Sequence, residues 1–115
     1  MISYYQIDIM GIVANRRLST RIPFRKRVKF GLSDPAFVGY TFNLSEGGVG
    51  IKADRVFHPL SRIILHIYME DEIVRLEGVV VWVSPTLPGI ISSMGLKFSS
   101  RTDDIKRIYQ QRISH

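Results

Sequence analysis

The sequence predicts one small all-β domain, a barrel or a sandwich, with a single α-helix packed on it at the C-terminus. A chain of 115 residues is enough for one domain with one modest core. Short runs of alternating apolar and polar residues, separated by turn residues, fill most of the chain, and this pattern is typical of antiparallel strands. Only the C-terminal tail changes to the helical period of three and four.

The N-terminal region has two expected parts. Residues 1–14 are apolar and alternate around Ile7, but they are shorter than the roughly 18 residues of a membrane-spanning helix. We expect an extra strand or a partner-contact segment there. Residues 15–24 form an arginine-rich arm, and Pro23 prevents a helix from running through it because proline lacks a backbone donor.

Six strand-like runs follow, at residues 27–32, 37–45, 49–53, 62–69, 72–84 and 94–98. The turns "SDPA", "EGG" and "EDE" separate several of them, and "EGG" predicts a hairpin. Alternation from residue 37 to 45 places Thr41 and Asn43 on one face of a strand, and Tyr40 and Phe42 on the other. The second half of the run 72–84 is apolar on both faces.

The tail, residues 103–113, predicts an amphipathic helix. Asp103 and Asp104 suit its positive N-terminus, and Ser100 or Thr102 can cap it. Its expected buried face carries Ile105, Ile108, Tyr109 and Ile113.

Charge and composition narrow the function. The chain has no cysteine, which excludes disulfides and thiolate chemistry and fits a reducing compartment, so we expect a cytoplasmic protein. Its net charge is +6, and arginines and lysines concentrate between Arg16 and Lys29. Such a local excess indicates an anionic partner, and the planar fork of arginine matches phosphate and the Hoogsteen edge of guanine.

Catalysis and metal binding are not expected. The histidines, His58, His66 and His115, are far apart and show no metal-ligand spacing. The acidic turn from Glu70 to Glu72 reads as a solvated turn rather than a cation site. We therefore expect neither an enzyme nor a protein with a cofactor.

The hairpin "NLSEGGVGI" offers a second set of polar groups. Asn43 and Ser45 lie two residues apart, so on a strand both side chains would point to one side. Gly47 and Gly48 permit positive φ and let a ligand approach the backbone. An amide, a hydroxyl and exposed N–H groups can read the edge of a purine. A plain β-turn is the alternative interpretation of the same residues.

Two motifs in this order resemble the PilZ domain family. The first is R-x-x-x-R, carried by Arg17 and Arg21 before the first strand, and the second is N-x-S-x-x-G, carried by Asn43, Ser45 and Gly48. The segments "RIPFRKRVKF", "GVVVWV" and "MGLKF" are also similar to parts of the family pattern. The resemblance covers roughly residues 15 to 113.

The resemblance implies a six-stranded antiparallel β-barrel, residues 15–115, with a flexible N-terminal arginine arm and a C-terminal helix. It also implies a bacterial receptor for the second messenger cyclic di-GMP. Many family members have Asp at the position of Asn43, whose amide oxygen accepts hydrogen bonds less strongly. The implied partner is a downstream protein or a second copy of the chain, without membrane insertion. The residues that the resemblance assigns to the ligand are Arg17 and Arg21 for phosphates and guanines, Arg16 for stoichiometry, Asn43 and Ser45 for guanine, Gly47 and Gly48 for the open turn, and Trp82 as a possible rim. Packing in the core is the alternative interpretation of Trp82.

Two other functions fit a small basic barrel. One is binding of single-stranded nucleic acid, which needs cations along several strands and stacking aromatics at alternate positions. We do not expect it, because the cations of this chain cluster in the arm. The other is a PilZ adaptor that has lost its ligand and binds only proteins, and the intact motif residues argue against it.

Overall fold

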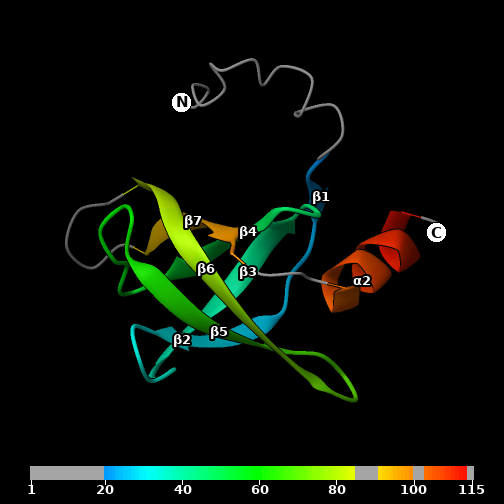
Figure 1. The fold of residues 1–115 in the computed structure, drawn as a ribbon, viewed down its shortest axis with the longest axis horizontal. Helices are drawn as coiled ribbons and strands as arrows, with labels where there is room; N and C mark the ends of the chain where they lie inside the picture. The colour runs from blue at the N-terminus through cyan, green and yellow to red at the C-terminus, as the bar shows by residue number, and fades with distance from the viewer. Residues whose placement is uncertain (1–19, 85–90, 100–102, 114–115) are drawn as a thin grey trace.

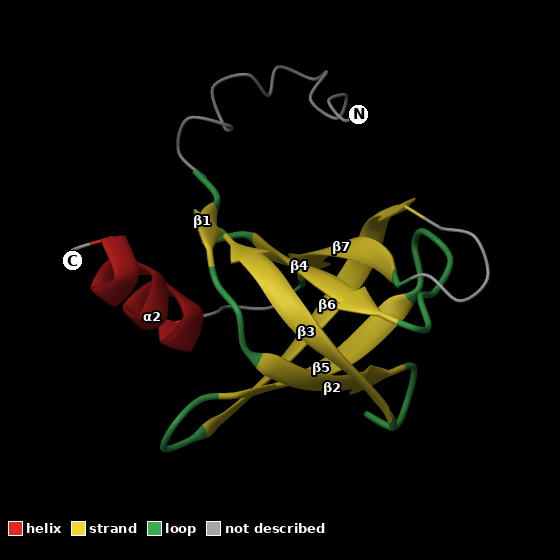
Figure 2. Cartoon of the chain, turned by 180° about the vertical axis from the view of Figure 1, so that it is seen from behind, coloured by secondary structure: helices red, strands yellow, loops and turns green. Residues whose placement is uncertain are grey.

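The structure is a computed structural model that describes residues 20–84, 91–99 and 103–113. Its sheet has the strand order β1-β3-β2-β5-β6-β7-β4, and an additional pairing between β3 and β4 closes it. Six strands therefore form a closed antiparallel barrel, and α2 lies outside it (Figures 1 and 2). This confirms the predicted fold class. The elements are β1 (Ile22–Pro23), β2 (Arg27–Gly31), β3 (Phe37–Leu44), β4 (Gly48–Ala53), β5 (Arg62–Tyr68), β6 (Ile73–Ser84), β7 (Ser92–Phe98) and α2 (Asp103–Ile113).

The barrel core comes from strict alternation in the strands. Along β5 every second residue is buried, and the first half of β6 repeats this pattern. The side chains with almost no exposed surface include Val28, Phe30, Ile51, Ile63, Leu65, Ile67, Val74, Met94 and Leu96. Strands β5 and β6 thus place their apolar faces inward, as burial of apolar surface requires. On β3, by contrast, Val38 and Tyr40 are exposed, and Gly39 and Thr41 are buried.

Two irregularities depart from the predicted alternation. The pairing of β3 with β4 shifts between Thr41 and Asn43, so Phe42 is an extra residue in β3. Thr41 is buried, and the next fully buried side chain on β3 is Leu44 instead of Asn43. The expectation that Thr41 and Asn43 share a face is therefore wrong. A second shift lies in β6, between Val80 and Trp82.

α2 packs against the rest of the structure through its apolar face. Ile105, Ile108 and Tyr109 are buried as predicted, but Ile113 is 49% exposed, so the buried face is shorter than expected. The Tyr109 hydroxyl donates a hydrogen bond of 2.6 Å to the carbonyl oxygen of Thr20. The helix therefore holds the segment that leads into β1. The two proposed capping residues of the helix lie outside the described residues.

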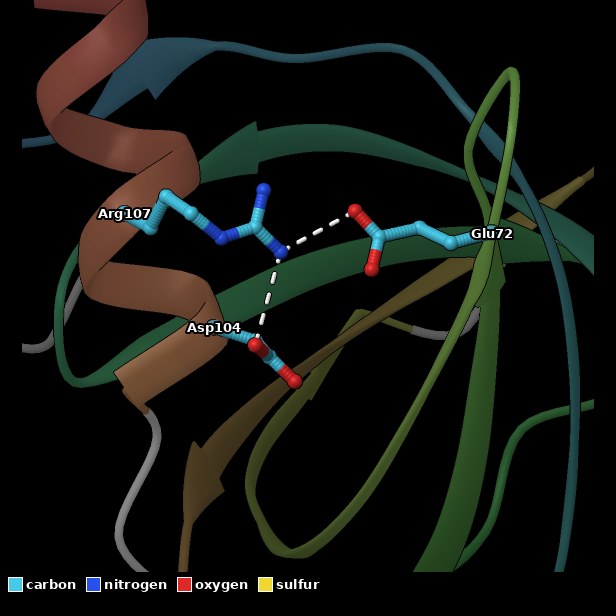
Figure 3. A network of polar contacts seen from close by, with 3 residues as sticks. All are labelled: Glu72, Asp104 and Arg107. Atoms are coloured by element: carbon cyan, nitrogen blue, oxygen red, sulfur yellow. Dashed lines mark hydrogen bonds and ion pairs between the residues drawn. The ribbon is translucent and has the colours of Figure 1, made fainter.

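Arg107 links α2 to the turn between β5 and β6 through a salt bridge. Its Nη2 atom lies 3.0 Å from Oε2 of Glu72 and 3.4 Å from Oδ1 of Asp104 (Figure 3). The hydrogen bond to Glu72, and then that to Asp104, raise the pKa of Arg107. Within the described residues, no helix is long and apolar enough to cross a membrane.

Candidate functional site

The segment between β1 and β2 is bonded along β3. Ile22 and Pro23 pair with Leu44 and Asn43, and the Phe24 amide donates to the Phe42 carbonyl at 3.3 Å. Pro23 is tolerated because β1 is a short edge strand. Further on, the Thr41 amide donates to the Lys26 carbonyl at 2.9 Å. These bonds fix Ile22 to Phe24, at the C-terminal end of the arm, and Lys26 beyond it.

Thr41 is the buried anchor of this segment. Its hydroxyl accepts a hydrogen bond of 2.8 Å from the Lys26 amide and donates one of 2.6 Å to the Phe24 carbonyl. The side chain is 1% exposed, so water cannot replace these bonds.

Replacing Thr41 with valine is expected to lower the free energy of unfolding by about 1–3 kcal/mol, because the buried Phe24 carbonyl and the partly buried Lys26 amide lose their partner. Urea denaturation measures the change. Thr41→Ser keeps the hydroxyl and is the matched control. Equal stability of Thr41→Val and Thr41→Ser would contradict this role.

Arg21 and Asn43 bring the two motifs together. Nη1 of Arg21 donates a hydrogen bond of 3.1 Å to Oδ1 of Asn43, across 22 residues of sequence. Arg21 lies just before β1, whose residue Pro23 is the register partner of Asn43. The pairing of β1 with β3 therefore places the arginine over the amide. Arg16 and Arg17 lie outside the described residues, as do residues 1–14.

Ser45 lies in the turn after β3, although the sequence predicted that it shares a strand face with Asn43. β3 ends at Leu44, and Ser45 is 4% exposed, whereas Asn43 is half-buried. The Ser45 hydroxyl accepts a hydrogen bond of 3.1 Å from the Gly48 amide, and the Ser45 amide donates one of 2.9 Å to the Gly48 carbonyl. Ser45 thus shapes the turn, and it does not continue the strand face of Asn43.

The two turn glycines, Gly47 and Gly48, differ in whether a side chain would fit at their positions. Neither adopts a positive φ in the left-handed region, so the turn does not use the conformational freedom that glycine permits. Gly48 is buried, and a Cβ there would collide with the backbone carbonyl of Leu96 on β7. Gly47 is exposed and a Cβ there would meet nothing within 4 Å. Gly48 is needed for close approach of the strands, and Gly47 leaves open space above the turn.

An aromatic pair covers the barrel surface beside Asn43. Phe42 and Trp82 lie edge to face with ring centroids 6.3 Å apart. They reach each other over Gly50 and Gly95, which are register partners on the intervening strands β4 and β7. A Cβ on Gly50 would be 2.5 Å from Cζ of Phe42 and 2.6 Å from Oδ1 of the Asn43 amide. The ring pair and the amide therefore share one surface, with Trp82 on its far side.

A basic hollow of about 440 Å³ adjoins this surface. Arg25, Lys26 and Arg112 contribute its cations, and Phe24, Phe42, Pro23 and Thr41 complete its lining. Arg112 lies 5.1 Å from the ring centroid of Phe24, so α2 supplies one wall. The sequence-based prediction did not include Phe42, Arg25 or Arg112. The bulge at Phe42 and the helix packing bring them here, and neither can be read from a motif.

The described residues contain no group of three or more histidine or acidic side chains that could hold a metal ion. What the site offers is an arginine fork and an amide on the surface, aromatic edges and a cluster of cations. These groups suit a ligand that carries both negative charge and a planar ring with polar edges.

Comparison with known proteins agrees with the predicted fold. The family model described as PilZ domain matches residues 15–113. A search among curated proteins found no match. Among solved structures, the inhibitor of motility MotI/DgrA of Bacillus subtilis is similar, with a TM-score of 0.67 and 16% identity over 86% of this chain. This chain covers 52% of that protein, or about half its length.

Two further structures are similar. The PilZ domain of YcgR from Escherichia coli, solved with c-di-GMP, has a TM-score of 0.66 and 17% identity, and the match covers 85% of this chain and 88% of that one. A tetrameric PilZ domain from Xanthomonas campestris has a TM-score of 0.63 and 11% identity, with coverage of 91% and 98%. The likeness in structure extends around the whole barrel, and the family model spans both motifs. The chain belongs to the PilZ domain family.

Proposed function

We propose that this protein is a receptor for cyclic di-GMP, bound between the arm and the hairpin. The arm contributes Arg16, Arg17 and Arg21, and the hairpin contributes Asn43 with the turn from Ser45 to Gly48. The hydrogen bond from Arg21 to Asn43 is the observation that carries the proposal, because it joins the two motifs in space. The PilZ domain of YcgR, a structural neighbour, was solved with this ligand.

The chemistry of the proposed site matches the ligand. Cyclic di-GMP presents two phosphates and two guanines, and an arginine can grip a phosphate or the O6/N7 edge of guanine with two hydrogen bonds. The amide oxygen of Asn43 can accept from the guanine N–H groups. Trp82 and Phe42 offer aromatic surface at the rim, on which a base can stack.

The proposed signal is an ordering of the arm. Seven arginines and lysines between Arg16 and Lys29 repel one another, and a dianionic ligand removes this repulsion. The Tyr109 hydroxyl holds Thr20, next to Arg21, so α2 would sense a movement of the arm. Binding would then change the surface shown to a downstream protein or to a second copy of the chain. Slower amide exchange in residues 15–24 upon addition of cyclic di-GMP is the expected result, and unchanged exchange there would contradict the ordering.

Titration of isotope-labelled protein with cyclic di-GMP, followed by NMR, tests the placement of the site. The expected result is a set of shifted amide signals from Arg21 and from Asn43 to Gly48, with little change along β5. Single-stranded RNA is the competitor in the same titration. Displacement of the ligand by RNA at similar concentration would favour nucleic-acid binding and contradict the proposal.

Asn43→Asp is expected to strengthen binding of cyclic di-GMP by about 1 kcal/mol, because a carboxylate accepts hydrogen bonds from guanine more strongly than an amide. Isothermal titration calorimetry measures the change at fixed ionic strength. Ser33→Asp adds the same single negative charge in the exposed turn after β2, away from both motifs, and it is the control. An unchanged or weaker affinity for Asn43→Asp would place guanine away from this side chain.

A further inference from the structure

The outer surface of four neighbouring strands carries a second cationic region, away from the motif residues. Register pairs arrange eight outward side chains in two rows across β3, β2, β5 and β6. We call these residues the cation–tyrosine face. The first row is Tyr40, Arg27, Tyr68 and Ile73, and the second row is Val38, Lys29, His66 and Arg75.

None of these eight positions is acidic, and three carry permanent positive charge. From the sequence we expected the cations to cluster in the arm. The cations of this face come instead from β2 and β6. The acidic turn from Glu70 to Glu72 borders the face. Two of its carboxylates are engaged, Glu70 by Lys26 at 3.6 Å and Glu72 by Arg107 at 3.0 Å.

Tyrosine rings hold the cations in place. The guanidinium of Arg27 lies 5.1 Å from the ring centroid of Tyr68, and the ammonium of Lys29 lies 5.8 Å from the same ring. The guanidinium of Arg25 lies 4.5 Å from the ring centroid of Tyr40. Because the rings restrict these long side chains, less conformational entropy is lost when an anion binds them.

Apolar side chains are exposed among the cations. Val38 is 52% exposed and Ile73 is 38% exposed, at opposite corners of the face, and Tyr40 is 42% exposed. Tyrosine and arginine are enriched in protein–protein interfaces, and exposed aliphatic groups gain free energy when a partner covers them. The combination has positive charge and apolar contact area within one region of the barrel surface.

The occupant that fits these features is an acidic protein surface. Single-stranded nucleic acid also needs cations on several strands, but it stacks its bases on free ring faces. Here Arg25, Arg27 and Lys29 already lie over the tyrosine rings. Fixed guanidinium forks suit carboxylates, which they bind with two hydrogen bonds. The exposed valine and isoleucine have no counterpart in a phosphate backbone.

We propose that the cation–tyrosine face binds a partner protein through a surface that combines carboxylates with aliphatic side chains. Arg27 and Lys29 are two residues apart on β2, so their Cα atoms are separated by about 6.8 Å. One carboxylate of an extended segment can therefore lie between the two cations, with an aliphatic side chain two positions away on the same side. The face does not include the motif residues, so it is a different site from the proposed ligand site.

NMR titration of the full chain with a designed peptide tests the proposal. The probe is a peptide of about twelve residues that repeats Glu-Glu-Val-Val, so that each side of an extended segment presents both glutamate and valine. Comparison peptides repeat Glu-Glu-Ser-Ser and Lys-Lys-Val-Val, and a single-stranded oligonucleotide of equal charge is the fourth probe. The expected result is shifted signals on β2, β3 and β5 with the first peptide, weaker binding of the serine peptide, and none of the lysine peptide.

Charge-reversal variants test whether the peptide binds at the cation–tyrosine face. Arg27→Glu with Lys29→Glu is expected to weaken binding of the Glu-Glu-Val-Val peptide at least about tenfold. Lys97→Glu with Lys106→Glu changes net charge equally on β7 and α2, and it is expected to retain most of the affinity. Arg75→Glu alone provides a milder variant if the double substitution unfolds the barrel, which its thermal melting would reveal.

Three outcomes would overturn the proposal. Equal losses in the test pair and the control pair would mean that only net charge matters. Equal affinity of the serine and valine peptides would remove the apolar contribution. Tighter binding of the oligonucleotide at this face would assign it to nucleic acid instead.

Discussion

Replacing Arg21 with alanine is expected to weaken binding of cyclic di-GMP by about 2–5 kcal/mol, because a charged ligand group loses its partner. The guanidinium lies 3.1 Å from the Asn43 amide oxygen, at the meeting point of the two motifs. Isothermal titration calorimetry of the full chain measures the loss.

The matched control for Arg21→Ala is Arg62→Ala. Arg62 is exposed on β5 and carries the same charge, so it accounts for the change in net charge alone. If both variants bound equally well, long-range electrostatics would explain the affinity and the site would lie elsewhere. Arg17→Ala is expected to cost as much as Arg21→Ala, since the first motif contains both arginines.

Replacing Gly48 with alanine is expected to destabilise the barrel by about 1–3 kcal/mol or more. The added Cβ would collide with the Leu96 carbonyl, which belongs to the backbone of β7 and cannot rotate away as a side chain can. Urea denaturation of Gly48→Ala and Gly47→Ala compares two adjacent glycines. The second variant is expected to change stability by less than about 0.5 kcal/mol, because its Cβ would meet no atom within 4 Å.

The comparison of the two glycine variants separates stability from binding. If Gly48→Ala were as stable as the parent chain, the glycine would serve the ligand and not the packing of β4 against β7. If Gly47→Ala lost stability, the turn would be constrained in a way that these contacts do not explain.

Most of the barrel could be predicted from the sequence because alternation is a local signal. The long strands β5 and β6 have the predicted faces, and the hairpin from Phe37 to Ala53 has nearly the predicted bounds, although the bulge at Phe42 changes the face on which Asn43 lies. β7 begins at Ser92, earlier than expected, because the two serines complete the pairing with β4. β1 could not be predicted, since two residues that include a proline carry no strand pattern and pair only because β3 is available.

The bulge at Phe42 is the irregularity with the largest consequence. It results from the pairing of β3 with β4, which no local pattern encodes, and it takes Asn43 out of the inward face. The motifs identified Arg21 and Asn43 as partners because the family order links them. Phe42 was missed as a neighbour of the site. A signal was available in retrospect, since Gly50 and Gly95 leave room for large side chains on the flanking strands.

Ser45 shows why a motif residue can have a structural role as well as an expected binding role. Its hydroxyl accepts from the Gly48 amide and so closes the turn that follows Asn43. The spacing N-x-S-x-x-G therefore describes a turn of defined shape, in which the serine and the final glycine are bonded to each other. In this chain the shape holds the amide of Asn43 at the surface beside Arg21.

Isothermal titration calorimetry with cyclic di-GMP and the full chain is the most direct test of the proposed function. A dissociation constant of about 1 μM or tighter, equivalent to roughly −8 kcal/mol, is the predicted result. The heats also give the stoichiometry, and an arginine at position 16 is compatible with a stacked pair of ligands. Absence of binding at a ligand concentration of about 100 μM would contradict the account.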